Sequence, residues 1–181
     1  MSRNGQIVEI PAKSLLYKRE IPTFSSKQEE LIWNSAERNY SLFDGFLVGE
    51  HPGVENFKIG QRKGINVGGK KAPLYVIAID KEDNRLFVGE GDLHPGLLTK
   101  AISFSENEMT WISDQNKAEF NLEKGLNVEI TSSVLENEVP AMLYQFDNQF
   151  FLEFKNAGLR VLKDHPIQIY YNKNQIILIN N

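Results

Sequence analysis

The amino-acid sequence predicts a mainly β protein (α+β): a small β-sheet domain with an N-terminal helix, followed by an antiparallel β-barrel of six or seven strands. Three observations predict this class. Short apolar runs recur between polar turns from Phe43 to the C-terminus. One stretch near the N-terminus has apolar residues at helical spacing. The composition, 41% hydrophobic and 24% charged over 181 residues, is typical of a soluble globular protein.

The chain is expected to divide at two places. Residues 1–42 form an N-terminal arm and helix, residues 43–94 a central β domain, and residues 95–181 the barrel. The second boundary falls in Leu93-His94-Pro95-Gly96, where proline and glycine interrupt the strand rhythm.

The first segment contains the predicted helix. Residues 6–11 read as a strand or an extended arm, and residues 14–19 as either a strand or one helical turn. Ser26, followed three residues later by Glu29, is a capping-box pattern, so we expect a helix over residues 26–39. Its apolar stripe is Leu31, Ile32, Ala36 and Tyr40.

The central domain is predicted to contain two hairpins. Residues 43–50 carry an Asp44-Gly45 turn signal between apolar residues. Residues 74–79 are almost entirely apolar, as in a buried strand, and a polar turn connects them to a strand at residues 85–89. The simplest assembly is a small sheet in which a glycine-rich loop enters the central strand.

The barrel strands are predicted from seven short apolar runs that polar turns separate. These runs are residues 101–104, 109–112, 126–130, 140–144, 149–154, 167–171 and 175–179.

The most distinctive segment is the loop at residues 56–71, which has five basic residues and no acid in a chain of formal net charge -4. A polyanion is therefore the first partner to consider. The candidate contact residues are Lys58, Gln61, Arg62, Lys63, Lys70 and Lys71, and the residues expected to shape the loop are Gly60, Gly64, Gly68 and Gly69. Gln61 also fits a structural role in the loop, which we favour. The alternative for the lysines is that they only keep the loop soluble.

A second basic segment follows an acidic one. Residues 72–154 hold five Lys or Arg and fifteen Asp or Glu, whereas residues 155–181 hold four bases and one acid. If a phosphate backbone is bound, we expect the bases of the final segment to lie on the same side as the basic loop. They are Lys155, Arg160, Lys163 and Lys173.

Several classes of site are not expected. The sequence has no cysteine, which excludes disulfides, cysteine-bound metals and protein-thiol chemistry by these residues. His51, His94 and His165 each stand beside proline without metal-ligand spacing, so we expect turn histidines bonded to backbone, no metal and no cofactor. No nucleophile-elbow pattern occurs. No apolar run is long enough to span a membrane and no signal peptide is visible, so a cytoplasmic location is expected.

The central domain resembles that of the tRNA-specific 2-thiouridylase family, formerly called tRNA methyltransferases. The matching residues come in order along the chain: 48–53 (Val-Gly-Glu-His-Pro-Gly), 58–69 (Lys-Ile-Gly-Gln-Arg-Lys-Gly-Ile-Asn-Val-Gly-Gly), Tyr75 to Asp80, 84–86, 88–89 and His94-Pro95. The likeness continues more faintly into the barrel. It implies a β domain and a barrel similar to domain 2 of elongation factor Tu, which together present a tRNA to a catalytic domain.

The sequence departs from the family in two ways. Neither the ATP-pyrophosphatase loop of the Ser-Gly-Gly-Val-Asp-Ser type nor a cysteine occurs in it, so we expect no enzyme activity from this chain alone. The family's tRNA-holding strand, Lys-x-Arg-Tyr-Arg-Gln, falls here on residues 131–136 (Thr-Ser-Ser-Val-Leu-Glu), which contain no base.

Two functions fit these observations. The first is a non-catalytic tRNA-binding accessory module for wobble-uridine thiolation that needs a separate catalytic subunit. The second is a degenerate paralogue that acts as a protein-interaction β-barrel and has lost tRNA binding. An enzyme of another type has no candidate residues in the sequence.

Overall fold

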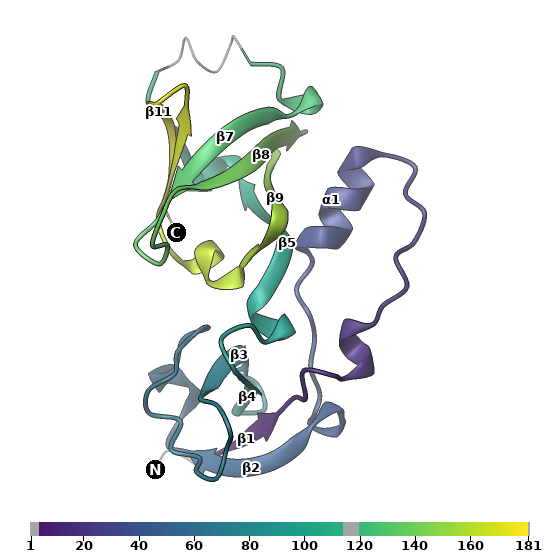
Figure 1. Cartoon of the computed structure of the whole chain (residues 1–181), viewed down its shortest axis with the longest axis vertical. Helices are drawn as coiled ribbons and strands as arrows, with labels where there is room; N and C mark the ends of the chain where they lie inside the picture. The colour runs from purple at the N-terminus through teal and green to yellow at the C-terminus, as the bar shows by residue number, and fades with distance from the viewer. Residues whose placement is uncertain (1–3, 114–119, 181) are drawn as a thin grey trace. The chain divides into compact units, whose positions relative to one another are not determined.

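The structure is a computed structural model that describes residues 4–113 and 120–180, and the chain forms two compact units (Figure 1). Unit 1 consists of Met1–Pro22 and Glu37–Leu98, and unit 2 of Thr23–Ala36 and Thr99–Asn181. The segment 1–42 is thus shared between the units, because its strand belongs to unit 1 and its helix to unit 2.

Strands dominate both units, which confirms the predicted mainly β class. Within the described residues the strands are β1 (Gly5–Glu9), β2 (Phe46–His51), β3 (Leu74–Asp80), β4 (Arg85–Glu90), β5 (Leu98–Ser105), β6 (Met109–Trp111), β7 (Leu126–Thr131), β8 (Val139–Phe146), β9 (Gln149–Leu159), β10 (Ile167–Tyr171) and β11 (Asn174–Ile179). The α-helix is α1 (Lys27–Ser35), and short 3-10 helices lie at Leu15–Tyr17, Leu42–Asp44, Val54–Asn56, Pro95–Leu97, Glu106–Glu108, Leu122–Lys124 and Arg160–Asp164. Among the helices of the described residues, none is both long and apolar enough to cross a lipid bilayer.

Unit 1 is built on a four-stranded sheet in the order β2-β1-β4-β3. β1 lies inside the sheet, antiparallel to β2 and parallel to β4, so the N-terminal residues form a strand and not a free arm. Gly45, just before β2, lies close to the end of β1, because a Cβ atom there would come 2.1 Å from the Glu9 carbonyl oxygen. A side chain at position 45 would therefore force the backbone apart.

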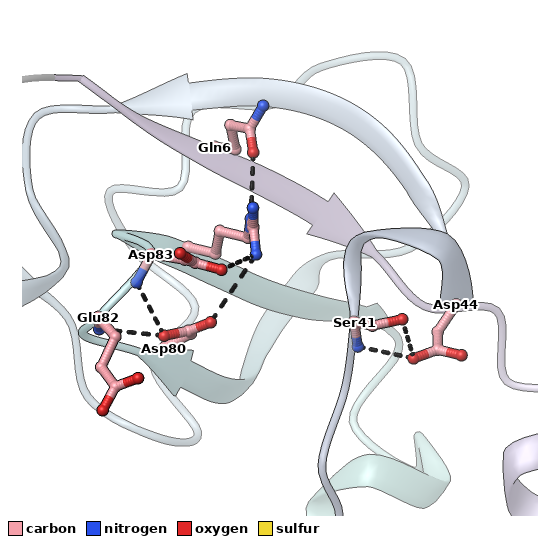
Figure 2. A network of polar contacts seen from close by, with 7 residues as sticks. Gln6, Ser41, Asp44, Asp80, Glu82 and Asp83 are labelled. Atoms are coloured by element: carbon pink, nitrogen blue, oxygen red, sulfur yellow. Dashed lines mark hydrogen bonds and ion pairs between the residues drawn. The ribbon is translucent and has the colours of Figure 1, made fainter.

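The predicted hairpin at residues 43–50 is wrong. The Asp44 carboxylate accepts hydrogen bonds from the Ser41 backbone N–H (2.6 Å) and hydroxyl (2.8 Å), which caps a 3-10 helix (Figure 2). Asp44-Gly45 thus ends a helical turn and leads into the single strand β2. The hairpin of β3 and β4 is confirmed.

The core of unit 1 lies on both faces of this sheet. One buried cluster packs Ile7, Leu74, Val76, Leu86 and Val88 with Phe57 and Ile65 of the glycine-rich loop. The other packs Val8, Ile10, Ile77, Phe87 and Leu97 with partly buried residues that include Tyr17 and Tyr40. The glycine-rich loop leads into β3, which is an edge strand and not the central strand that we expected.

Helix α1 begins as predicted and ends earlier. The Ser26 hydroxyl accepts from the Glu29 backbone N–H at 3.1 Å, as an N-cap should. The helix ends at Ser35, and the chain returns to unit 1 from Glu37 onward. There Arg38 donates to the Pro95 and Leu98 carbonyls, and Tyr40 packs in the core.

Unit 2 is a curled sheet of seven strands in the order β5-β9-β8-β7-β10-β11-β6, which confirms the predicted strand number (Figure 1). The pairs whose register is defined run antiparallel. Its inner face is filled by aliphatic and phenylalanine side chains, among them Leu143, Phe150 and Ile177. On the outer face, Leu31 of α1 is fully buried against Ala101, Tyr144 and Phe151.

Candidate functional site

The basic loop, residues 56–71, leads from the Val54–Asn56 turn towards β3 and is fixed to the sheet by apolar side chains. Phe57 and Ile65 are 7% and 4% exposed, and Ile59 and Val67 pack against the same cluster. Lys58, between Phe57 and Ile59, is exposed, and so are Arg62 and Lys63 before Ile65. The loop therefore presents its basic side chains from a fixed backbone.

Backbone hydrogen bonds hold the loop along the free edge of β3. The Gly60 N–H donates to the Val76 carbonyl at 2.8 Å, and the Val76 N–H donates to the Gln61 carbonyl at 2.9 Å. Gly60, Gly64 and Gly69 have φ values of 78°, 87° and 76°, which favour glycine, whereas Gly68 has no positive φ. Three of the four predicted glycines thus turn the backbone of the loop.

Gln61 is used inside the loop. Its side-chain oxygen accepts from the Lys58 N–H at 3.0 Å, and its side-chain nitrogen donates to the Lys63 carbonyl at 2.8 Å. Both ends of the amide are therefore bonded to the loop backbone. This geometry agrees with the structural role that we favoured over direct contact with a ligand.

The basic residues of the loop fall into two groups. Lys70 is partly buried and forms an ion pair with Glu9 of β1, which holds the end of the loop to the sheet. Lys58, Arg62, Lys63 and Lys71 are exposed, and no ion pair joins them to another described residue. We call these four the exposed basic set.

Arg85, at the start of β4, is another basic residue of unit 1, and its guanidinium is paired with carboxylates. Its guanidinium contacts Gln6 at 3.2 Å, Asp80 at 4.0 Å and Asp83 more closely (Figure 2). Asp80 also accepts from the Glu82 and Asp83 backbone N–H groups at 3.0 Å, which closes the β3–β4 turn. Arg85 therefore stabilises the turn, and two carboxylates lie close to its positive charge.

The histidines of unit 1 confirm the prediction of turn residues bonded to backbone. His94 is 2% exposed, its Nδ1 accepts from the Gly96 N–H at 3.1 Å and its Nε2 lies 2.9 Å from the Ile10 carbonyl, so Nε2 carries the proton. His51 is also buried, and its Nδ1 accepts from the Gly53 N–H at 3.1 Å. Within residues 4–113 and 120–180, no three His, Asp or Glu side chains are grouped to hold a metal ion.

The pKa of His94 is lowered, mainly because burial disfavours the charged imidazolium. The folded state then binds this proton less readily than the unfolded chain, so stability is full above about pH 6.5 and falls as the pH drops towards the lowered value. The loss is at most about 1.4 kcal/mol per pH unit. We expect His94→Gln to make the unfolding free energy less dependent on pH between about 7.5 and 5. Urea denaturation at several pH values measures the unfolding free energy. An equal pH dependence of that free energy in the two proteins would contradict the expectation.

A groove on unit 2 was missed by the sequence analysis. It has a volume of about 850 Å³ and lies on the outer face of the sheet, with α1 along one side. Its lining residues are Glu30, Asn34, Lys100, Asn127, Val128, Glu129, Pro140, Ala141, Met142, Glu153, Phe154, Lys155, Tyr170, Asn172 and Lys173. Lys155 and Lys173 of the final basic segment thus share one groove with Lys100. No local sequence motif predicts this set, because its residues come from α1, from five strands and from the turn after β10, which are spread along the sequence.

Comparison with known proteins gives consistent matches. Residues 30–90 match the family described as the tRNA methyl transferase PRC-barrel domain. Three similar proteins are each named tRNA-specific 2-thiouridylase MnmA. That of Christiangramia forsetii is 31% identical over 94% of this chain and 43% of its own length. That of Flavobacterium johnsoniae is 31% identical over 97% of this chain and 44% of its own length. That of Karelsulcia muelleri is 33% identical over 97% of this chain and 42% of its own length. The chain spans less than half the length of these relatives.

Proposed function

The chain belongs to the tRNA-specific 2-thiouridylase family over the part of those proteins that it matches, and from this premise we propose that it binds tRNA through its basic loop. In this role the chain positions a tRNA for thiolation of the wobble uridine. It is an accessory module, and a catalytic subunit outside these 181 residues supplies adenylation and sulfur transfer.

One observation carries the proposal: the exposed basic set stands on a loop whose backbone is fixed. Lys58, Arg62, Lys63 and Lys71 face solvent, while Phe57 and Ile65 hold the loop in the core. Because the backbone is already ordered, phosphate binding does not have to order the loop, and only the side chains lose conformational entropy. Arg62 can bind a phosphate with two parallel hydrogen bonds, and the lysines act as point charges.

The division of labour follows from the side chains available. Persulfide chemistry needs a thiolate, and the sequence contains no cysteine. Residues 131–136 comprise the last residue of β7 and the turn that follows it, and none of them is basic. They therefore offer no positive charge to a phosphate. The basic loop is therefore the part of the chain best suited to hold the tRNA backbone.

The salt dependence of tRNA binding tests this proposal. We expect the affinity for unfractionated tRNA to fall steeply with added salt, with a logarithmic slope of roughly 3 if each exposed cation meets one phosphate. Fluorescence anisotropy at several salt concentrations measures it. The proposal is wrong if tRNA does not bind even at low salt, or binds with an affinity that salt leaves unchanged.

The second candidate function is binding of a protein partner by unit 2. The groove favours it, because it is lined by both apolar and charged side chains. The two functions use different units and are tested separately.

A further inference from the structure

The groove on unit 2 is the strongest feature that tRNA binding by the basic loop does not use. Its volume of about 850 Å³ lies within the range of sites that hold a drug-sized ligand or a short peptide. Its floor is the outer face of β7, β8, β9 and β10, and α1 contributes Glu30 and Asn34 along one side.

The carboxylates of the groove are partly neutralised from within. Lys27 of α1 donates to Glu153 at 2.7 Å and to Glu30 at 3.0 Å. By contrast, no ion pair joins Lys100, Lys155 or Lys173 to any residue in the described part of the chain. Glu129 is the one lining carboxylate without an ion pair to a described residue. Counted with Lys27, the groove holds four lysines and three glutamates, a net charge of +1.

The strand order places these charges at two ends of the groove. Lys100 and Lys155 stand on the neighbouring strands β5 and β9, whereas Lys173 stands in the turn between β10 and β11. β8 and β7 lie between them: β8 contributes Pro140 and Met142 to the floor, and β7 contributes Asn127 and Glu129. With about 4.8 Å between strands, β5 and β10 are at most about 19 Å apart across the sheet.

We propose that this groove binds a short acidic peptide segment of a protein partner. The segment has carboxylates at both ends and apolar side chains in its middle, and it crosses the strands over about six residues at roughly 3.3 Å each. One end of the segment meets Lys100 and Lys155, and the other end meets Lys173. Its middle packs on Met142 and Pro140. Complementary charge then sets the orientation and apolar contact adds affinity.

A nucleic acid fits this groove less well. Phosphates are evenly spaced and would have to pass the unpaired Glu129 and an apolar centre. A sequence-tolerant site for a single strand also needs several exposed aromatic rings, and Tyr170 is the only tyrosine or tryptophan that lines the groove.

The test uses the full chain and a fluorescein-labelled hexapeptide, Glu-Glu-Leu-Ile-Glu-Glu, in fluorescence anisotropy titrations. We expect saturable binding, which Lys155→Glu with Lys173→Glu weakens by on the order of tenfold or more. Lys81→Glu with Lys124→Glu is the matched control, because it changes the net charge equally at exposed residues outside the groove, and it should leave the affinity unchanged. Circular dichroism verifies that both variants are folded.

Three results would overturn the inference. One is the absence of saturation below about 1 mM peptide. Another is equal binding of a hexapeptide in which glutamine replaces every glutamate, because charge would then not matter. The third is loss of tRNA affinity together with peptide affinity in the Lys155 and Lys173 variant, which would make the groove a nucleic-acid site. The peptide titration does not depend on the basic loop. If tRNA does not bind to the basic loop, peptide binding by the groove is still expected, so the two proposals can fail separately.

Discussion

Replacing Phe57 by alanine is expected to lower the free energy of unfolding of unit 1 by about 3–5 kcal/mol. Phe57 is 7% exposed, packs in the cluster that includes Ile7 and Val76, and meets His51 edge-on with ring centroids 5.5 Å apart. Truncation removes this buried ring and leaves a cavity under the start of the basic loop. Native-state hydrogen exchange of the β4 amides, which lie inside the sheet, measures the loss.

Phe43→Ala is the matched control for this change. The same side chain is removed, but Phe43 is 94% exposed, so the effect should stay within about 0.5 kcal/mol. The Phe57 variant should also bind tRNA more weakly under conditions where unit 1 is still folded, because its loop is less well fixed. Equal stability of the two variants would show that the loop is not anchored through Phe57.

The sequence allowed the strands to be predicted wherever their pattern is local. All seven predicted runs of the second half became strands of the unit 2 sheet, because alternating apolar residues between polar turns fix both the strand and its buried face. Turns such as Asp147-Asn148 and Asn172-Lys173 have residues with positive φ, as tight hairpins require.

Non-local pairing limited the prediction of unit 1. The pattern of residues 6–11 left a strand and an extended arm open, and only the fold inserts β1 between β2 and β4. The Asp44-Gly45 signal was misread because Ser41, three residues earlier, offers the aspartate a helix-capping partner. The expected helix over residues 26–39 was too long, since Tyr40 packs in the core of unit 1 and not on the helical stripe.

The candidate site shows the same limit. The composition of residues 56–71 identified the basic loop as a segment, and Lys58, Arg62, Lys63 and Lys71 are exposed on it. Composition could not show that Lys70 is paired with Glu9, which lies far away in the sequence. The groove of unit 2 depends entirely on strand order, so no sequence pattern could have indicated it.

Reversing the charge of Arg62 and Lys63 is expected to weaken tRNA binding by on the order of 100-fold at low salt. Arg62→Glu with Lys63→Glu removes two phosphate contacts and places two carboxylates against the RNA backbone. The magnitude of the logarithmic slope of affinity against salt should also fall by about 1.5, the share of two of the four contacts. Both side chains are exposed, so the fold and the hexapeptide affinity should not change.

The most direct measurement for the central claim is therefore a tRNA titration of three proteins at one low salt concentration. They are the unmodified chain, the Arg62→Glu with Lys63→Glu variant, and the control Lys81→Glu with Lys124→Glu, which alters the net charge equally elsewhere. We predict that the control binds tRNA within about twofold of the unmodified chain and that the loop variant loses binding by the factor given above. If both variants lose tRNA affinity by the same factor, the tRNA responds to the net charge of the chain and not to the basic loop. That result would contradict tRNA binding by the basic loop.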